Sequence, residues 1–424
     1  MPQWLTRSAK HLFLKSLETM PEGFLEIVCP SRTYTFGDPE ASLRALLEIH
    51  DERFFVRALL GGDTGMGESY MDGEWSSPDV VSAVRLAVRN ADVLEPQNRA
   101  FSAARRVLDY VQQRLHDNTV KGSRENIRAH YDLGNEFFRL FLDPSLMYSC
   151  AYYRNADDTL EQAQAEKLDR ICRKLRLTPG DRVLEIGTGW GAFALHAARH
   201  YGCKVTTTTI SREQHEYVAR RLSRMGSVRH NITLLFEDYR KLTGKYDKIV
   251  SIEMFEAVGF DHYDEFFSAC DRLLEPDGSM LLQSITMLDQ KFQAYRRKAD
   301  WLQKYIFPGA QLGSLSGILD SLARATQLTM YHAEDIGIHY ARTLEEWRAR
   351  FHARIPAVRE LGFDERFIRM WDFYLASCAG SFLERYISDV QLVLTKTLNR
   401  CPLMNEPWPN TQSTTVRMSL SIPV

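Results

Sequence analysis

The chain has 424 residues, of which 44% are hydrophobic and 25% are charged, and its formal net charge is -2. This length predicts two or three domains with sizeable cores, and the near-neutral charge argues against a nucleic-acid partner. The seven cysteines are scattered and lack metal-ligand spacing, which favours a reducing compartment and neither a disulfide framework nor a zinc site. No apolar run is long enough to cross a bilayer, and the N-terminus lacks the apolar core of a signal peptide. We therefore predict a cytoplasmic protein without a metal.

The first 115 residues predict a small α+β domain. Phe24–Val28 and Arg32–Phe36 have strand patterns on either side of a Pro-Ser turn, as in a β-hairpin. Amphipathic helices are expected around Phe54–Leu60 and Pro78–Arg89. The run Gly61–Gly67 lacks the Gly-Lys-Ser/Thr ending of a phosphate loop, so it is expected to be a cluster of turns.

Composition divides the rest of the chain into three parts. An amphipathic helix is expected over Ala103–His116, followed by a polar linker at residues 116–125. Residues 126–400 form the second and larger domain. The tail, residues 401–424, is rich in Pro, Ser and Thr and is expected to be poorly ordered.

In the larger domain, apolar strands and amphipathic helices alternate regularly from Leu168 onward. This alternation predicts a doubly wound parallel sheet. Residues 287–328 interrupt it and are expected to be a helical insertion. Strands over Thr329–Asp335 and around Val390–Thr397 are then expected to close the sheet.

The stretch Val183–Ala198 (VLEIGTGWGAFALHAA) predicts a buried strand, a glycine turn and the start of a helix. Glycines let the backbone approach a ligand, and the free N–H groups at a helix start face it. A dinucleotide is one ligand that fits, because Gly187, Gly189 and Ala192 satisfy Gly-x-Gly-x-x-Ala. That fold also wants an acidic residue about 20 positions later for a ribose, but the strand Lys204–Thr209 ends without an acid.

The glycine turn is similar instead to motif I of the class I S-adenosylmethionine methyltransferases. In that motif an acidic residue ends the strand before Gly-x-Gly-x-Gly, and Glu185 stands in that place. A glycine turn without a ligand is the alternative, which the strand–turn–helix context disfavours. We therefore predict an α/β, Rossmann-like class I methyltransferase fold with helical insertions and a smaller α+β N-terminal domain.

Further motifs occur along nearly the whole chain. Those of the larger domain are His130–Asn135, Tyr148–Tyr152, Gly187–Gly191, Thr209–Ser211, Asp238–Arg240, Met254–Glu256, Tyr305–Gly309 and Cys378–Gly380. Together with Phe54–Leu60 and Gly67–Trp75 in the first domain, they resemble the cyclopropane-fatty-acyl-phospholipid synthases and related lipid C-methyltransferases. So many motifs in one order are far more specific than a single Gly-x-Gly. The resemblance implies that residues 1–115 bind lipid.

The resemblance also implies a binding site for S-adenosylmethionine. The strand that ends at Thr209 and the residues after it would take the ribose side, which explains the missing acid, and the Asp238 region would border the adenine. The implied cofactor residues are Tyr148, Ser149, Glu185, Gly187, Thr188, Gly189, Gly191, Thr209, Ile210, Ser211, Gln214, Asp238 and Tyr239.

Members of this family hold a bicarbonate ion beside the reacting carbons. The resemblance assigns its binding groups to Cys150, Glu256, Gln283, Ile285 and Tyr340. Cys378 falls at the position of the family's active-site cysteine. A buried thiol is the alternative for Cys378, because this chemistry needs no covalent enzyme adduct.

Two positions depart from the family pattern. Ala257 and Gln283 stand where many members have histidine, and Glu253 precedes Met254. The pattern Ile-Glu-Met-x-Glu-Ala-Val-Gly includes relatives that methylate or methylenate acyl chains without closing a ring. The resemblance therefore implies a cyclopropane product, with a methyl- or methylene-branched chain as the alternative.

An alkene is a poor nucleophile, so the chemistry needs a sulfonium methyl donor held in line with the double bond. The resulting carbocation needs a dry, aromatic pocket, for which Tyr148, Tyr305, Phe307 and Tyr340 are candidates. Bound bicarbonate would then accept the proton, as the resemblance implies.

The implied substrate is a cis-unsaturated acyl chain in a membrane phospholipid. We expect transient contact with the inner face of the membrane through residues 1–115 and 287–328, the latter carrying Arg296, Arg297 and Lys298. The resemblance also makes a homodimer an expectation. A non-catalytic lipid-binding protein and a methyltransferase acting on small molecules or nucleic acid are the competing classes. The intact glycine turn and Glu256 disfavour the first, and the missing basic stripe disfavours the second.

Overall fold

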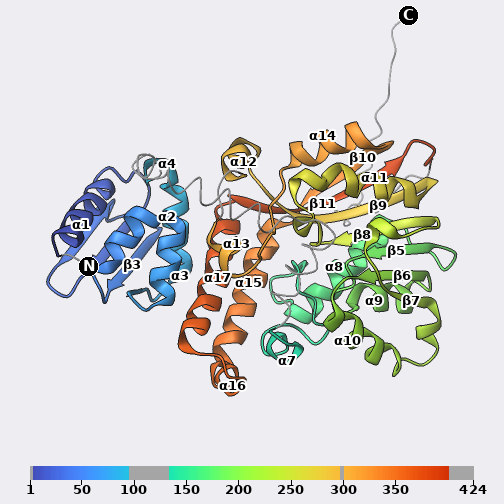
Figure 1. Ribbon diagram of the computed structural model, residues 1–424, viewed down its shortest axis with the longest axis horizontal. Coiled ribbons are helices and arrows are strands. Elements are labelled where there is room, and N and C mark those ends of the chain that lie inside the picture. Colours follow the sequence, from blue (N-terminus) through green and yellow to red (C-terminus); the bar gives the residue numbers. More distant parts are fainter. Residues whose placement is uncertain (1–2, 95–132, 297–299, 401–424) are drawn as a thin grey trace, which may run out of the picture.

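The computed structural model describes residues 3–94, 133–296 and 300–400, and Figure 1 shows their arrangement. Several sequence predictions fall outside these ranges and are left as predictions. They are the helix over 103–116, the linker at 116–125, the tail at 401–424, the His130–Asp132 part of one motif, and Arg297 and Lys298.

The N-terminal region contains a four-stranded sheet of order β2-β1-β3-β4. The predicted hairpin is confirmed, since β1 and β2 pair antiparallel with Val28 opposite Thr33. The first helix and β3 were not predicted. The elements are α1 (Gln3–Leu17), β1 (Phe24–Val28), β2 (Thr33–Gly37), β3 (Arg44–Ile49), α2 (Arg53–Met71), β4 (Trp75–Ser76), α3 (Val80–Arg89) and α4 (Ala91–Leu94).

The prediction of a turn cluster at Gly61–Gly67 was wrong. This run lies inside α2, which is kinked at Gly62 (φ 54°, ψ -135°). A Cβ at Gly65 would meet the Arg57 carbonyl oxygen at 2.0 Å, so a glycine is needed where the two halves of the helix meet. Burial of Phe55 before the kink and Tyr70 after it holds the helix together despite its glycines.

The larger sheet has seven strands in the order β10-β11-β9-β8-β5-β6-β7. The strands from β9 to β7 are parallel, as predicted. The elements are α7 (Asn135–Phe138), α8 (Leu160–Lys174), β5 (Arg182–Ile186), α9 (Ala192–His200), β6 (Lys204–Thr209), α10 (Arg212–Leu222), β7 (Ile232–Phe236), β8 (Tyr246–Ile252), α11 (Tyr263–Leu273), β9 (Leu274–Met287), α12 (Asp289–Tyr295), α13 (Trp301–Tyr305), α14 (Leu315–Ala325), β10 (Leu328–Asp335), α15 (Gly337–Ala353), α16 (Ile355–Glu360), α17 (Glu365–Leu383) and β11 (Ile387–Lys396).

One strand corrects the prediction of a wholly parallel sheet. β11 runs antiparallel to both of its neighbours, β9 and β10. Helices α15 and α17 pack on each other and bring the chain back to the edge where β10 ends. There the Ile336 N–H donates to the Asp389 carbonyl over 2.7 Å. Because β11 starts at the edge of the sheet where β10 ends, β11 must run in the direction opposite to β10.

Successive residues of the central strands point to opposite faces of the larger sheet, and each face has its own helices. Val183 and Val205 pack with α8 and α9 on one face. Leu184 and Ile249 pack with α11 and α14 on the other. This two-sided burial explains the consecutive apolar residues Val183–Leu184 of β5 and Ile249–Val250 of β8, all completely buried.

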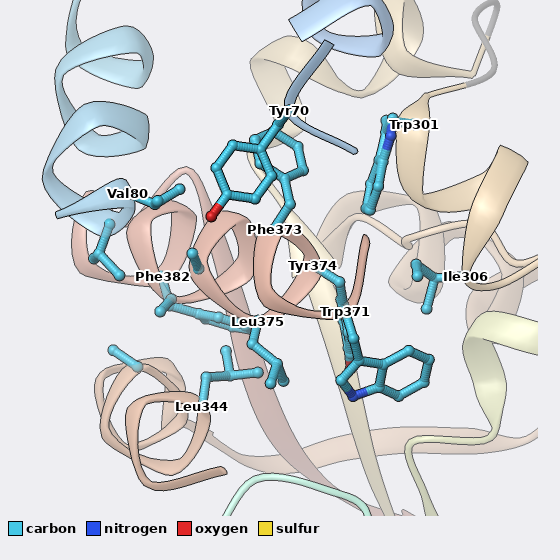
Figure 2. Packing of buried hydrophobic residues seen from close by; sticks show 14 of the residues in the cluster. Tyr70, Val80, Trp301, Ile306, Leu344, Trp371, Phe373, Tyr374, Leu375 and Phe382 are labelled. Atoms are coloured by element: carbon cyan, nitrogen blue, oxygen red, sulfur yellow. The ribbon is translucent and has the colours of Figure 1, made fainter. Parts of the chain in front are cut away.

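Helices α15 and α17 lie between the two sheets and join them through a common core (Figure 1). In Figure 2, Tyr70 from α2 and Trp301 from α13 approach Phe373 of α17. The ring centroids of Trp301 and Phe373 are 5.0 Å apart. The Tyr70 hydroxyl donates to the buried Asp372 carboxylate over 2.5 Å, and Arg348 donates to the same carboxylate over 2.6 Å. The N-terminal region is therefore anchored to the larger unit by α17.

Within the described parts of the chain, no helix combines the length and apolarity that a membrane span requires.

Candidate active site

The glycine turn follows β5, at the carboxyl end of the parallel strands. Gly187, Gly189 and Gly191 all have positive φ, at 100°, 52° and 83°. A Cβ on Gly187 would lie 3.0 Å from the Met254 Cβ, whereas a Cβ on Gly189 would meet no atom of the described residues within 4 Å. Gly189 thus presents bare backbone to open space at a helix start, which fits the close approach of a cofactor such as S-adenosylmethionine.

Glu185 lies buried just before the turn. Its Oε2 is 2.6 Å from the Thr207 hydroxyl, which is itself 2.7 Å from the Thr188 hydroxyl. Burial raises the pKa of Glu185 to about 8, because the surrounding sheet excludes water from this carboxyl. Glu185 and Thr188 are therefore both hydrogen-bonded to Thr207 of β6, which fixes the glycine turn against the sheet.

The predicted ribose-side residues lie together at the end of β6. Thr209 donates its hydroxyl proton to Gln214 Oε1 over 2.8 Å. Ser211 caps α10 by accepting the Gln214 backbone N–H over 3.3 Å, and Ile210 lies between Thr209 and this cap. These contacts fix the Gln214 amide in one orientation beside the glycine turn.

Asp238 and Tyr239 follow β7 on the same edge. The Asp238 carboxylate accepts two bonds from the Arg240 guanidinium, over 2.9 and 2.8 Å. The Tyr239 ring packs on Phe266 with centroids 5.3 Å apart. Asp238 thus stabilises the turn after β7, and both of its carboxylate oxygens are hydrogen-bonded to Arg240.

Aromatic side chains gather next to the glycine turn. The Tyr148 hydroxyl lies 2.8 Å from the Tyr374 hydroxyl. The Tyr148 ring lies 5.3 Å from Trp347 and 6.5 Å from Phe307, between ring centroids. Tyr340 stacks on Phe382 at 4.5 Å. The structure thus brings three of the four aromatic candidates, Tyr148, Phe307 and Tyr340, together around Trp347.

Tyr305, the fourth candidate, does not join these rings. Its hydroxyl donates to Glu68 Oε1 of α2 over 2.9 Å, and its ring lies 5.5 Å from Trp301. The structure therefore places Tyr305 at the contact with the N-terminal region.

Glu253 lies at the centre of the predicted anion site. Its Oε1 accepts the Cys150 backbone N–H and a Gln283 amide N–H, each over 2.8 Å. Its Oε2 accepts the Tyr340 hydroxyl proton over 2.6 Å. Three groups that the sequence analysis assigned to bicarbonate thus converge on a side-chain carboxylate. The Glu253 backbone has φ 47°, which L-residues other than glycine rarely adopt.

Two further carboxylates lie close to Glu253. Gln283 donates its second amide N–H to Asp389 Oδ2 over 2.8 Å. Glu256 Oε1 accepts the Ile285 backbone N–H over 2.5 Å and the Ser284 hydroxyl proton over 3.0 Å. Burial raises the pKa of Glu256 to about 8, and its Oε2 has no hydrogen-bond partner among the described residues. We call Glu253, Glu256 and Asp389 the carboxylate cluster.

One buried ammonium group faces the carboxylate cluster. Lys167 of α8 is completely buried and donates to the Ser149 hydroxyl over 2.6 Å. Burial raises the pKa of Glu253 and Asp389, whereas the charge of Lys167 opposes that rise. Ser149, which the resemblance assigned to the cofactor, therefore holds this lysine in place.

Sequence analysis missed Lys167, Asp389 and Gln391. Gln391 donates to Gln283 Oε1 over 2.9 Å and accepts a bond from Lys174 over 2.6 Å. Asp389 and Gln391 are completely buried polar residues of β11, and Lys167 lies on the buried face of its helix. Polar residues that interrupt an apolar pattern were the available signal.

Cys378 lies on α17, one turn after Tyr374. Burial raises the pKa of its thiol, so the sulfur is protonated and a poor nucleophile at neutral pH. Cys378 is partly buried, and its protonated thiol favours the alternative of a structural role over that of a nucleophile.

The residues present do not fit a bicarbonate ion where the resemblance places it. The Cys150 N–H, both N–H bonds of the Gln283 amide and the Tyr340 hydroxyl are bonded to Glu253 or Asp389. The remaining assigned donor, the Ile285 N–H, is bonded to Glu256. A further anion would find these donors engaged, and it would lie beside three carboxyl groups whose pKa values are already raised.

The strand order, the antiparallel β11 and the glycine turn after β5 define a class I S-adenosylmethionine-dependent methyltransferase. Residues 118–392 match the family described as mycolic acid cyclopropane synthetase. The chain is 38% identical over 363 residues to the cyclopropane-fatty-acyl-phospholipid synthase of Escherichia coli, an alignment covering 84% of this chain and 89% of that one. It is 37% identical over 342 residues, 79% of each chain, to the tuberculostearic acid methyltransferase UfaA1 of Mycobacterium tuberculosis. The chain belongs to this family.

Solved structures agree with that assignment. The cyclopropane synthase MmaA2 from Mycobacterium tuberculosis is 33% identical with a TM-score of 0.60, covering 64% of this chain and 98% of that one. The mycolic acid cyclopropane synthase CmaA1 complexed with SAH and CTAB is 34% identical, with the same TM-score and coverage. The predicted family, fold class and methyltransferase activity are confirmed.

Proposed function

We propose that this enzyme adds a one-carbon unit from S-adenosylmethionine to the cis double bond of an acyl chain in a membrane phospholipid. The observation that carries the proposal is a buried carboxylate cluster with an aromatic surface beside the glycine turn. A dry aromatic surface suits a cationic hydrocarbon intermediate, and a buried carboxylate suits the removal of its proton. Bound S-adenosylmethionine supplies an electrophilic methyl group on a sulfonium.

The reaction begins when the π electrons of the double bond attack that methyl carbon. The carbon–sulfur bond breaks, its electron pair stays on sulfur, and the acyl chain becomes a carbocation. The faces of Tyr148, Phe307 and Tyr340 can stabilise this cation by about 1–2 kcal/mol each. A C–H bond of the new methyl group then breaks, and its electron pair closes the cyclopropane ring.

A methyl- or methylene-branched chain is the second candidate product. The position of Glu253 favours it, because a base fixed to the backbone can reach a different hydrogen from a mobile ion. The similarity to a tuberculostearic acid methyltransferase is compatible with this second product.

We also propose that the enzyme contacts the inner face of the membrane from the cytoplasm, through residues 1–115 and 287–328, and that it forms a homodimer. Among the described residues, Trp4 is 69% exposed and Leu12 is 45% exposed on α1. Arg296 is a weaker argument for membrane contact, because its guanidinium already packs on the Phe260 ring, 3.5 Å from the ring centroid. Light scattering of the purified protein would test the dimer.

The test of the proposed function is mass spectrometry of vesicles of cis-monounsaturated phospholipid incubated with enzyme and S-adenosylmethionine. We expect the acyl chain to gain one CH2 without added hydrogen. Resistance to hydrogenation would identify a ring, and a reducible double bond would identify the branched product. No mass gain by an enzyme that still binds the cofactor would contradict the proposal.

A further inference from the structure

We infer that Glu253 provides the reaction's base from within the chain, in the place where the family resemblance puts bicarbonate. The inference rests on the proposed function and deepens it. It implies that the enzyme works without a dissolved anion, whereas the resemblance implies one.

The first argument is the number of donors. Glu253 accepts three bonds, from the Cys150 N–H, the Gln283 amide and the Tyr340 hydroxyl, over 2.6 to 2.8 Å. Three donors converging on one buried group are what a carboxylate or a bicarbonate needs, and Glu253 satisfies all three. The donors come from different parts of the chain, so their convergence is a property of the fold.

The second argument is the backbone at residue 253. Its φ of 47° favours glycine, and a residue with a side chain adopts it only under strain. The Glu253 N–H donates to the Gln283 carbonyl over 2.8 Å, which ties the strained residue to the end of β9. This backbone directs the carboxylate toward its three donors.

The third argument is charge. Glu253, Glu256 and Asp389 face each other, and Lys167 is the buried cation that interacts with both Glu253 and Asp389. A bicarbonate ion would be a fourth acid group beside one lysine, in a place where burial already raises the pKa of the three carboxyl groups present. A carboxylate attached to the chain also needs no capture from solvent, which removes an entropic cost.

The proton step balances with Glu253 as the base. The C–H bond of the new methyl group breaks, its electron pair forms the ring bond, and the proton passes to a Glu253 oxygen. Glu253 becomes a neutral carboxylic acid and must release the proton to solvent before the next turnover. A methyl-branched alkene forms instead when a C–H bond of the chain next to the cationic carbon breaks and its electron pair forms a C=C bond. A methylene branch forms when a hydride first shifts from the methyl-bearing carbon to the cationic carbon, and the methyl group then loses a proton to Glu253 while its C–H electron pair forms the C=C bond.

The decisive experiment compares turnover by the full-length enzyme in buffer stripped of carbon dioxide and in the same buffer with bicarbonate added. We expect wild-type turnover to be unchanged by bicarbonate. Product formation that requires bicarbonate would overturn the inference while leaving the proposed function intact. No product under either condition would contradict the proposed function itself.

A variant gives an independent test with a binding readout. Glu253→Gly suits the positive φ and frees the three donors, so it creates a site that bicarbonate can fill. We expect its turnover to fall by about 100-fold in stripped buffer and to recover with bicarbonate. Calorimetry should detect bicarbonate binding to this variant and none to wild type.

Glu253→Gln is the matched control, because its amide fills the same space without a basic oxygen. We expect turnover to fall as far as in Glu253→Gly, with no recovery on adding bicarbonate. Full activity of either variant in stripped buffer would exclude Glu253 as the base. Cofactor affinity, measured in parallel, would separate a loss of chemistry from a loss of fold.

Discussion

At the scale of single residues, the site is built from backbone conformations that most residues avoid. The three glycines of the turn adopt positive φ because they have no Cβ. Glu253 adopts a positive φ despite its side chain, and its carboxylate receives three hydrogen bonds. The glycine turn could be predicted from its spacing, but the placement of Glu253 could not, because its donors are 30 to 103 positions away.

Gly189 provides the residue-scale prediction. Gly189→Leu should abolish S-adenosylmethionine binding, because the new side chain would fill the space that the bare backbone leaves open. A leucine at this φ of 52° also strains the backbone, so the control must be a leucine at another glycine with positive φ. Gly362 has φ 92° and also leaves open space, but it lies between α16 and α17. Calorimetry should show binding to Gly362→Leu and none to Gly189→Leu; binding to both would refute the cofactor site.

At the scale of elements, helix α8 places buried lysines beside β9 and β11, two strands with buried polar side chains. Lys167 faces the carboxylate cluster, and Lys174 bonds to Gln391 of β11. Gln283 of β9 and Gln391 pair in the sheet and hydrogen-bond through their side chains. Buried polar groups of this kind are stable only when each has its partner, so the helix and the two strands depend on each other.

Lys167→Met tests that dependence. Removal of one partner from a buried charge group should cost about 3–5 kcal/mol of unfolding free energy near pH 8. Without the ammonium, the pKa values of Glu253 and Asp389 rise further. A carboxyl with a raised pKa in the folded protein favours folding less as the pH rises. The loss of unfolding free energy in Lys167→Met, relative to wild type, should therefore shrink toward about pH 5.

Chemical denaturation at several pH values would measure this effect. Lys204→Met, at the exposed start of β6, is the matched control and should leave stability within about 0.5 kcal/mol of wild type. A deficit that is equal at both ends of the pH range would show that Lys167 acts through packing and not through its charge.

At the scale of the whole molecule, the two sheets are joined by a helical layer and share one core. Helices α2 and α3 pack on α17, and α17 also packs on α15. The described N-terminal elements are therefore held by α17 on the side away from the larger sheet, and α1 lies farthest from that sheet (Figure 1). This arrangement suits a region that contacts a surface while the reaction takes place elsewhere.

Trp4 tests the proposed membrane contact. Trp4→Ser should weaken binding to anionic phospholipid vesicles roughly 30-fold, because a buried large apolar side chain contributes about 2 kcal/mol. Leu361 is 44% exposed at the end of α16, and Leu361→Ser is the control. Cosedimentation should separate the two variants, and equal binding by both would place the contact away from α1.

The sequence alone determined the features that depend on neighbouring residues. Strand–glycine–helix spacing predicted the cofactor turn, the alternation of elements predicted the layered sheet, and ordered motifs identified the family. These patterns are local because positive φ, helix starts and buried strands are set within a few residues.

The tertiary structure alone decided what depends on distant contacts. It placed Gly61–Gly67 inside a helix, because burial outweighed the low helix propensity of glycine. It turned β11 antiparallel, because α15 and α17 return the chain to the same edge. It also brought Glu253 onto donors from Cys150, Gln283 and Tyr340, since only packing can bring together groups so far apart in the chain.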